Sequence, residues 1–154
     1  MSLEIIYDGI INYIKDNIET YLDALKSDNI DLPLYKRYIK NSIFDVQGNT
    51  IYPLMAMEYG RGTIERETTQ SDRYLIPITF YSVSVGGDAE ALVITSERYV
   101  WALRTMFQAD PTLSGLVDYV NVQGFEFSPA IKKTNTISTT GVLYTVFDTL
   151  IERK

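Results

Sequence analysis

The chain has 154 residues, of which 45% are hydrophobic and 22% charged, and its formal net charge is −6. This length favours one domain with a sizeable core over two domains. Cysteine and histidine are both absent, which excludes disulfides, thiolate catalysis and metal sites built on those ligands. The acidic balance argues against a strong grip on nucleic-acid phosphates, and no apolar run is long enough to span a membrane.

An amphipathic helix over Ile5–Leu25 is the first predicted element. Isoleucine, tyrosine and leucine recur at helical spacing along one stripe, and polar residues lie outside that stripe. Pro33 prevents an easy continuation of the helix. Tyr35–Phe44 then fits either a short helix or an irregular strand, and its apolar residues do not decide between them.

A turn, a strand and a polar segment follow. Gln47-Gly48-Asn49 predicts the turn, and Ile51–Tyr59 predicts a strand that Pro53 confines to an edge or a strand start. Gly60–Arg73 is polar and rich in threonine, so we interpret it as a hairpin tip or a long loop, poorly ordered in the free protein. Its charged residues are the candidate contacts of an assembly loop: Arg61, Glu65, Arg66, Glu67, Asp72 and Arg73.

The most strongly patterned stretch is Tyr74–Phe127. Its first part, Tyr74–Val85, is rich in β-branched and aromatic residues and predicts a strand. The alternation changes phase near Phe80–Tyr81, which indicates either a bulge or cover on both faces of the sheet. Asp88 is a candidate N-cap for a central helix, Asp88–Gln108, whose wide apolar stripe faces the core.

Trp101 lies in the central helix but outside its main apolar stripe. We interpret it as a core residue on a second face of the helix, because large aromatic residues are mostly buried. The alternative is an exposed aromatic side chain that contacts a partner subunit, since tryptophan and tyrosine are enriched at interfaces. The 12 tyrosines of the chain raise the same question.

The C-terminal third predicts two more strands. Val120–Phe127 has strand composition, Ser128–Thr140 reads as a polar and basic loop, and Val142–Ile151 alternates cleanly. We expect the two strands to form an antiparallel hairpin, with the last strand covered on both sides for much of its length. The whole pattern predicts a single α/β domain of the α+β type over residues 1–154, with a mainly antiparallel sheet and the N-terminal and central helices packed on it.

Three stretches carry a resemblance to a known family: Arg98–Leu103, Asp110–Val120 and Phe127–Pro129, followed by the last alternating strand. Through these stretches, the region 88–151 resembles the small tail-terminator and head–tail joining (neck) proteins of long-tailed bacteriophages and their prophage remnants. The resemblance implies a structural protein of the virion, assembled in the bacterial cytoplasm, that forms a six-fold ring, closes the tail tube and joins tail to head. It implies as partners further copies of the chain, the tail-tube protein and a head-completion protein, and it implies no catalytic residues, cofactor or metal.

Charge separation adds candidate contacts for such a ring, because a closing ring needs two different and complementary surfaces. We expect a basic patch to approach acids on the neighbouring subunit and to set the register of the contact. The candidate interface residues are Asp16, Glu19, Asp23, Lys36, Arg37, Lys40, Lys132 and Lys133. Two other functions stay open on the residues alone: a monomeric adaptor that binds a peptide at a sheet edge, and a carboxylate-dependent enzyme.

Overall fold

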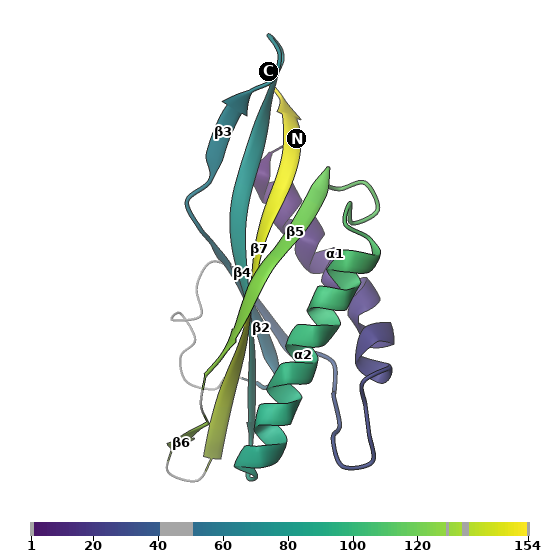
Figure 1. Ribbon diagram of the computed structural model, residues 1–154, viewed down its shortest axis with the longest axis vertical. Helices are drawn as coiled ribbons and strands as arrows, with labels where there is room; N and C mark the ends of the chain where they lie inside the picture. Colours follow the sequence, from purple (N-terminus) through teal and green to yellow (C-terminus); the bar gives the residue numbers. More distant parts are fainter. Residues whose placement is uncertain (1, 41–50, 129, 134–135, 154) are drawn as a thin grey trace.

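The computed structural model describes residues 2–40, 51–128, 130–133 and 136–153. Over these residues the chain forms one α+β domain in which two helices lie on one face of a mostly antiparallel sheet (Figure 1), which confirms the predicted fold class. The helices are α1 (Leu3–Asp23) and α2 (Ala89–Ala109). The strands are β1 (Arg37–Lys40), β2 (Leu54–Tyr59), β3 (Thr63–Arg66), β4 (Ser71–Gly86), β5 (Tyr119–Phe127), β6 (Ile131–Lys133) and β7 (Thr136–Glu152).

The described strands follow the order β1-β2-β4-β7-β5, with β3 added to β4 and β6 added to β7. Only β1 and β2 are parallel, and every other pair is antiparallel. The pairing of β5 with β7 confirms the predicted C-terminal hairpin. For Tyr35–Phe44 the strand alternative holds in β1, whereas the predicted turn at Gln47-Gly48-Asn49 lies outside the described residues.

The phase change near Phe80–Tyr81 is not a bulge, because β4 pairs with β7 without a register shift from Ser71 to Gly86. Instead the strand is covered on both faces at this level. Ile78 and Phe80 belong to the main core under the helices, whereas Val83 joins a smaller buried cluster on the other face. That second cluster also contains Ile39, Leu54 and Ala56.

The last strand, β7, is buried on one face for most of its length, so the expected cover on both sides is wrong. Leu143 and Phe147 face the helices and are fully buried, whereas Tyr144 and Leu150 on the opposite face are exposed. The reason is that both described helices lie on the same side of the sheet (Figure 1). The apolar residues on the exposed face of β7 therefore do not contribute to the core of the single chain.

Both helices begin at capped ends and pack against the same core. The Ser2 hydroxyl accepts the N–H of Ile5, and the Asp88 carboxylate accepts the N–H groups of Glu90 and Ala91, as predicted for Asp88. The apolar stripes of both helices face the sheet. Their fully buried members include Ile6, Ile10, Ile14, Ile18, Tyr99, Leu103 and Phe107.

Both polar segments contain strands, although one was predicted as a hairpin tip or a loop and the other as a loop. Gly60–Arg73 contains β3 and the start of β4, which is the hairpin alternative. Ser128–Thr140 contains β6 and the start of β7, so the loop interpretation is wrong there. Strand pairing satisfies the backbone without apolar side chains, and threonine is a good strand former. Thr139 is buried, and its hydroxyl donates to the Leu92 carbonyl at 3.3 Å.

Candidate functional site

A β-bulge in the edge strand β5 decides which side chains face α2. The register with β7 shifts between Val122 and Gly124, so Gln123 is an extra residue without a partner. Val120 lies on the helix face before the bulge, and Phe125 and Phe127 lie on it afterwards, opposite Leu143 and Gly141 of β7. The sequence carries the signal, since apolar residues move from even to odd positions across Gln123-Gly124, and glycine inside a strand marks such bulges.

Trp101 lies against Phe125 and is exposed. Its indole meets the Phe125 ring edge-on, with centroids 5.7 Å apart and an interplanar angle of 89°. The Arg104 guanidinium lies over the indole, 4.6 Å from its centroid. Trp101 is 40% exposed and Phe125 is 55% exposed. The core interpretation of Trp101 is therefore wrong, because Ala102 and Leu103 take the buried positions at this level of α2.

These aromatic rings line a groove of about 410 Å³. We call it the aromatic groove; its lining residues are Leu25, Glu97, Arg98, Trp101, Phe125 and Phe127. Arg98 donates from Nη1 to the Leu25 carbonyl and to the Ser27 hydroxyl, both at 3.0 Å. Within the described residues neither Arg98 nor Arg104 forms an ion pair with a carboxylate. The groove thus has an apolar floor, its rim carries Arg98 and Glu97, and the Arg104 guanidinium lies over the indole.

The groove opens beside an unpaired sheet edge. The first part of β5 is covered by the preceding turn, where the Val120 N–H donates to the Pro111 carbonyl at 2.8 Å. From Val122 to Phe127 no described strand pairs with the outer edge of β5. Such an edge offers free N–H and C=O groups to another chain. Lys132 lies further along the same side of β7, on β6, and is exposed.

The turn that leads into β5 is fixed to α1. The Tyr13 hydroxyl donates to Asp110 Oδ2 at 3.0 Å, and the same oxygen accepts the Ser114 N–H at 2.8 Å. Burial first, and then the Asp110 carboxylate, raises the pKa of Tyr13 to about 12. Burial of Asp110 by itself raises its pKa, but hydrogen bonds from Ser114, Tyr13 and Thr112 outweigh this effect and lower the pKa.

Close packing completes the attachment of this turn. A Cβ on Gly9 of α1 would lie 2.8 Å from the terminal methyl groups of Leu116, so a larger residue at position 9 requires the Leu116 side chain to move. Leu113, Ser114 and Gly115 have positive φ angles of 49°, 57° and 88°. The turn is thus held in a demanding backbone conformation by contacts to α1, and it determines where β5 begins.

The predicted acidic residues lie on one exposed stripe of α1. Asp16, Glu19 and Asp23 are all exposed, and their spacing places them on the side of the helix that faces away from the core. Asp23 forms an ion pair with Lys26 at 2.9 Å. Asp16 and Glu19 have no ion-pair partner among the described residues.

The predicted basic residues do not form one patch within the chain. Lys36, Arg37 and Lys40 lie at or next to β1, whereas Lys132 and Lys133 lie on β6. Strands β2, β4 and β7 separate these two sets. Lys40 also forms an ion pair with Asp8 of α1. The reason is topological, since β1 and β6 are added to opposite sides of the sheet.

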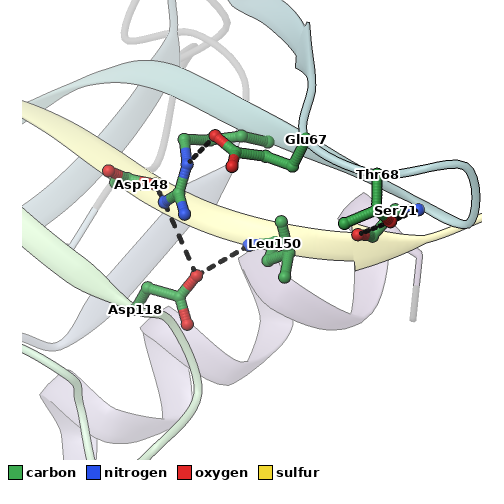
Figure 2. A network of polar contacts seen from close by, with 7 residues as sticks. Glu67, Thr68, Ser71, Asp118, Asp148 and Leu150 are labelled. Carbon is green, nitrogen blue, oxygen red and sulfur yellow. Dashed lines mark hydrogen bonds and ion pairs between the residues drawn. The ribbon is translucent and has the colours of Figure 1, made fainter.

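The candidate assembly-loop residues divide into engaged and exposed groups. Figure 2 shows the polar network near the turn of the β3–β4 hairpin, in which Arg73 forms ion pairs with Glu67 at 2.8 Å, with Asp148, and with Asp118 at 3.8 Å. Asp118 also accepts the Leu150 N–H at 2.9 Å. The carboxylate of Asp72 pairs with Arg153 at 3.4 Å. Arg61, Glu65 and Arg66 remain exposed on the hairpin.

The network has a structural consequence for the hairpin. It ties the turn end of the hairpin to β7 and to the residue before β5 (Figure 2). The chain after β7 also holds the tip, because the Arg153 N–H donates to the Gln70 carbonyl at 2.6 Å. The expectation of a poorly ordered loop over Gly60–Arg73 is therefore wrong for its second half, where ion pairs and strand pairing fix the backbone.

No group of three or more carboxylates among the described residues is placed to hold a metal ion. No described helix is long and apolar enough to cross a membrane. No protein-family model matches the chain, and no curated protein matches it.

Proposed function

We propose that the chain is a ring-forming assembly protein of a long-tailed phage or prophage, which closes the tail tube and joins the tail to the head. The observation that carries this proposal is the exposed Trp101–Phe125 pair beside the open edge of β5. Exposed aromatic residues next to arginine are typical anchors of protein interfaces. The phage assignment and the number of six copies come from the resemblance in residues 88–151.

The distribution of surfaces supports a ring over a two-fold dimer. The acidic stripe lies on α1, and the aromatic groove lies between α2 and β5. Two different surfaces suit a heterologous contact, which closes into a ring when the rotation permits. The net charge of −6 also suits a channel for DNA, because acidic walls repel phosphates.

A monomeric adaptor is the second candidate, and the open β5 edge favours it. An extended peptide can add a strand to such an edge and place side chains in the adjacent groove. The two functions differ in the mass of the particle. An adaptor stays a monomer when concentrated and gains only the mass of its peptide, whereas a ring subunit gains several copies of itself.

Light scattering after size-exclusion chromatography tests the proposal directly. We expect particles of about six copies, visible as rings by negative-stain electron microscopy, for the chain alone or together with the tube protein encoded beside it. Gene neighbours give an independent test, since a tail-terminator gene should lie between head-completion and tail-tube genes. A monomer in both preparations, or neighbours that encode no virion proteins, would overturn the proposal.

A further inference from the structure

The outward stripe of α1 combines one exposed apolar residue with acids. Ile5 lies in the first turn of the helix, next to exposed Glu4, and is itself 57% exposed. At 100° per residue Ile5, Asp16, Glu19 and Asp23 share the face opposite the buried isoleucines. The stripe is therefore apolar at its N-terminal end and negative at its C-terminal end.

The edge formed by β5 and β6 carries features that complement the stripe of α1 in the same order. The aromatic groove at Trp101 and Phe125 is apolar, with Arg104 above the indole. Further along, Lys132 pairs with Ile137 of β7, which places its side chain on the same face of the sheet as Phe125. The edge is thus apolar at one end and positive at the other.

The spacing of these features is also compatible, because the distance from the groove to Lys132 falls within the acidic part of the stripe. Ile5 and Asp23 are 18 helical residues apart, or about 27 Å at a rise of 1.5 Å per residue. Phe125 and Lys132 face β7 positions Leu143 and Ile137, six strand residues apart or about 20 Å. With Ile5 in the groove, the middle of the acidic stripe lies beside Lys132.

We propose that α1 of one copy lies along the β5–β6 edge of the next copy, with Ile5 in the aromatic groove and Asp16, Glu19 and Asp23 facing Lys132. This contact rests on the proposed ring and names its interface. The stripe faces away from the core that α1 shares with α2, so it cannot fill the groove of its own chain. Each copy therefore offers one surface and receives the other, which is the arrangement that a ring requires.

Cross-linking tests the contact and its direction. Because the chain has no cysteine, a bis-maleimide joins only residues introduced for the purpose. Glu4→Cys mixed with Thr105→Cys, next to Trp101, should give a cross-linked dimer. Glu4→Cys mixed with Lys132→Cys tests the reverse direction and should give only background. Glu4→Cys mixed with Asn121→Cys is the matched control, since Asn121 is exposed on the other face of β5.

A charge swap provides the second measurement. Lys132→Glu and Glu19→Lys should each weaken association by about tenfold at low salt, and the two changes in one chain should restore it, because the pair is then reversed as a whole. Glu152→Lys, at an exposed acid near the end of β7, should leave association unchanged. Sedimentation velocity over a dilution series measures these constants.

The outcomes separate this contact from the proposed function. Rings without Glu4–Thr105 cross-links, or a swap that fails to restore association, overturn the α1 contact and leave the ring intact. Cross-links that follow the reverse pairing overturn the stated direction. A chain that stays monomeric both alone and with its tube protein overturns the contact and the proposed ring together.

Discussion

Trp101 is the single tryptophan of the chain, and its indole forms part of the aromatic groove. An exposed indole next to a guanidinium group contributes little to folding of the isolated chain. The sequence places Trp101 off the main stripe of α2, but it does not say which neighbours cover that position. Those neighbours depend on the bulge in β5, which is a feature of another element.

In contrast to Trp101 on the same helix, Leu103 is fully buried in the core. Leu103→Ala should lower the free energy of unfolding by about 2–5 kcal/mol, because it removes buried apolar atoms and leaves a cavity. Lys15→Ala, at an exposed residue of α1, is the control and should change it by less than about 1 kcal/mol, although the ammonium lies 4.9 Å from the Tyr38 ring centroid. Urea unfolding measures both values, and equal losses would contradict the assigned core.

The carboxyl group of Asp110 makes stability depend on pH. Its pKa is lower in the folded chain than in the unfolded chain, so folding favours the carboxylate. The contribution is therefore present above the unfolded pKa of about 3.9 and is lost as the pH falls through the lowered folded value. Asp110→Asn removes this charge and keeps an acceptor oxygen.

The prediction for Asp110 concerns a difference between two melting curves. The melting temperature of the native chain should exceed that of Asp110→Asn at pH 6, and the difference should shrink as the pH falls below about 4. Tyr13→Phe removes one hydrogen-bond donor to the Asp110 carboxylate. Its melting temperature at pH 6 should also lie below that of the native chain, but by less than for Asp110→Asn. A difference that stays constant from pH 6 to acid would show that the hydrogen bonds to Asp110 do not carry the effect.

Among the elements, β5 shows most clearly how one extra residue sets the facing of side chains. Deleting Gln123 removes the bulge but leaves Val122 and Gly124 on the consecutive β7 partners Thr145 and Tyr144, so Phe125 and Phe127 should stay on the face toward α2. The emission of Trp101 should then match that of the native chain. Inserting one alanine after Gly124 instead shifts the rest of the strand by one residue, which should turn Phe125 and Phe127 to the opposite face, remove the aromatic groove and red-shift the emission of Trp101. Equal emission spectra for the deletion and the insertion would contradict this role of the bulge.

Patterning was sufficient for the long elements and failed for the polar ones. The stripes of α1 and α2 and the alternation of β7 reflect burial, which the sequence records directly. Gly60–Arg73 and Ser128–Thr140 form strands because β4 and β7 extend far enough to pair with them. Pairing of this kind depends on backbone hydrogen bonds, which leave no periodic trace in polar side chains. The ion pairs of Arg73 likewise join residues that are distant in the sequence.

At the scale of the whole molecule, charge is divided among surfaces rather than balanced within them. The acids of α1 were predicted correctly as exposed residues, but the basic residues divide between β1 and β6. The sequence alone does not separate these two sets, because strand order determines which residues are neighbours. The pairing of acids with bases across two copies stays a prediction.

Reversing Lys132 and Lys133 together to glutamate tests that prediction. Assembly should slow at low salt, because long-range attraction to the acids of α1 becomes repulsion. The effect should fade as salt approaches about 0.1 M, where the Debye length is about 10 Å. Stopped-flow light scattering across a salt series measures the rate, and Lys132→Gln with Lys133→Gln separates loss of attraction from repulsion. An unchanged rate at every salt concentration would contradict a role for these charges in assembly.

The pairing of β4 with β7 has a mechanical consequence. All 16 residues of β4 pair with β7, and the two strands run along the longest axis of the molecule (Figure 1). In antiparallel strands the hydrogen bonds lie perpendicular to the strand direction. Tension along this axis therefore loads the whole ladder in shear, so the bonds must break together rather than one after another. A subunit pulled between its β3 end and its β6 end should resist extension far better than one pulled across the sheet.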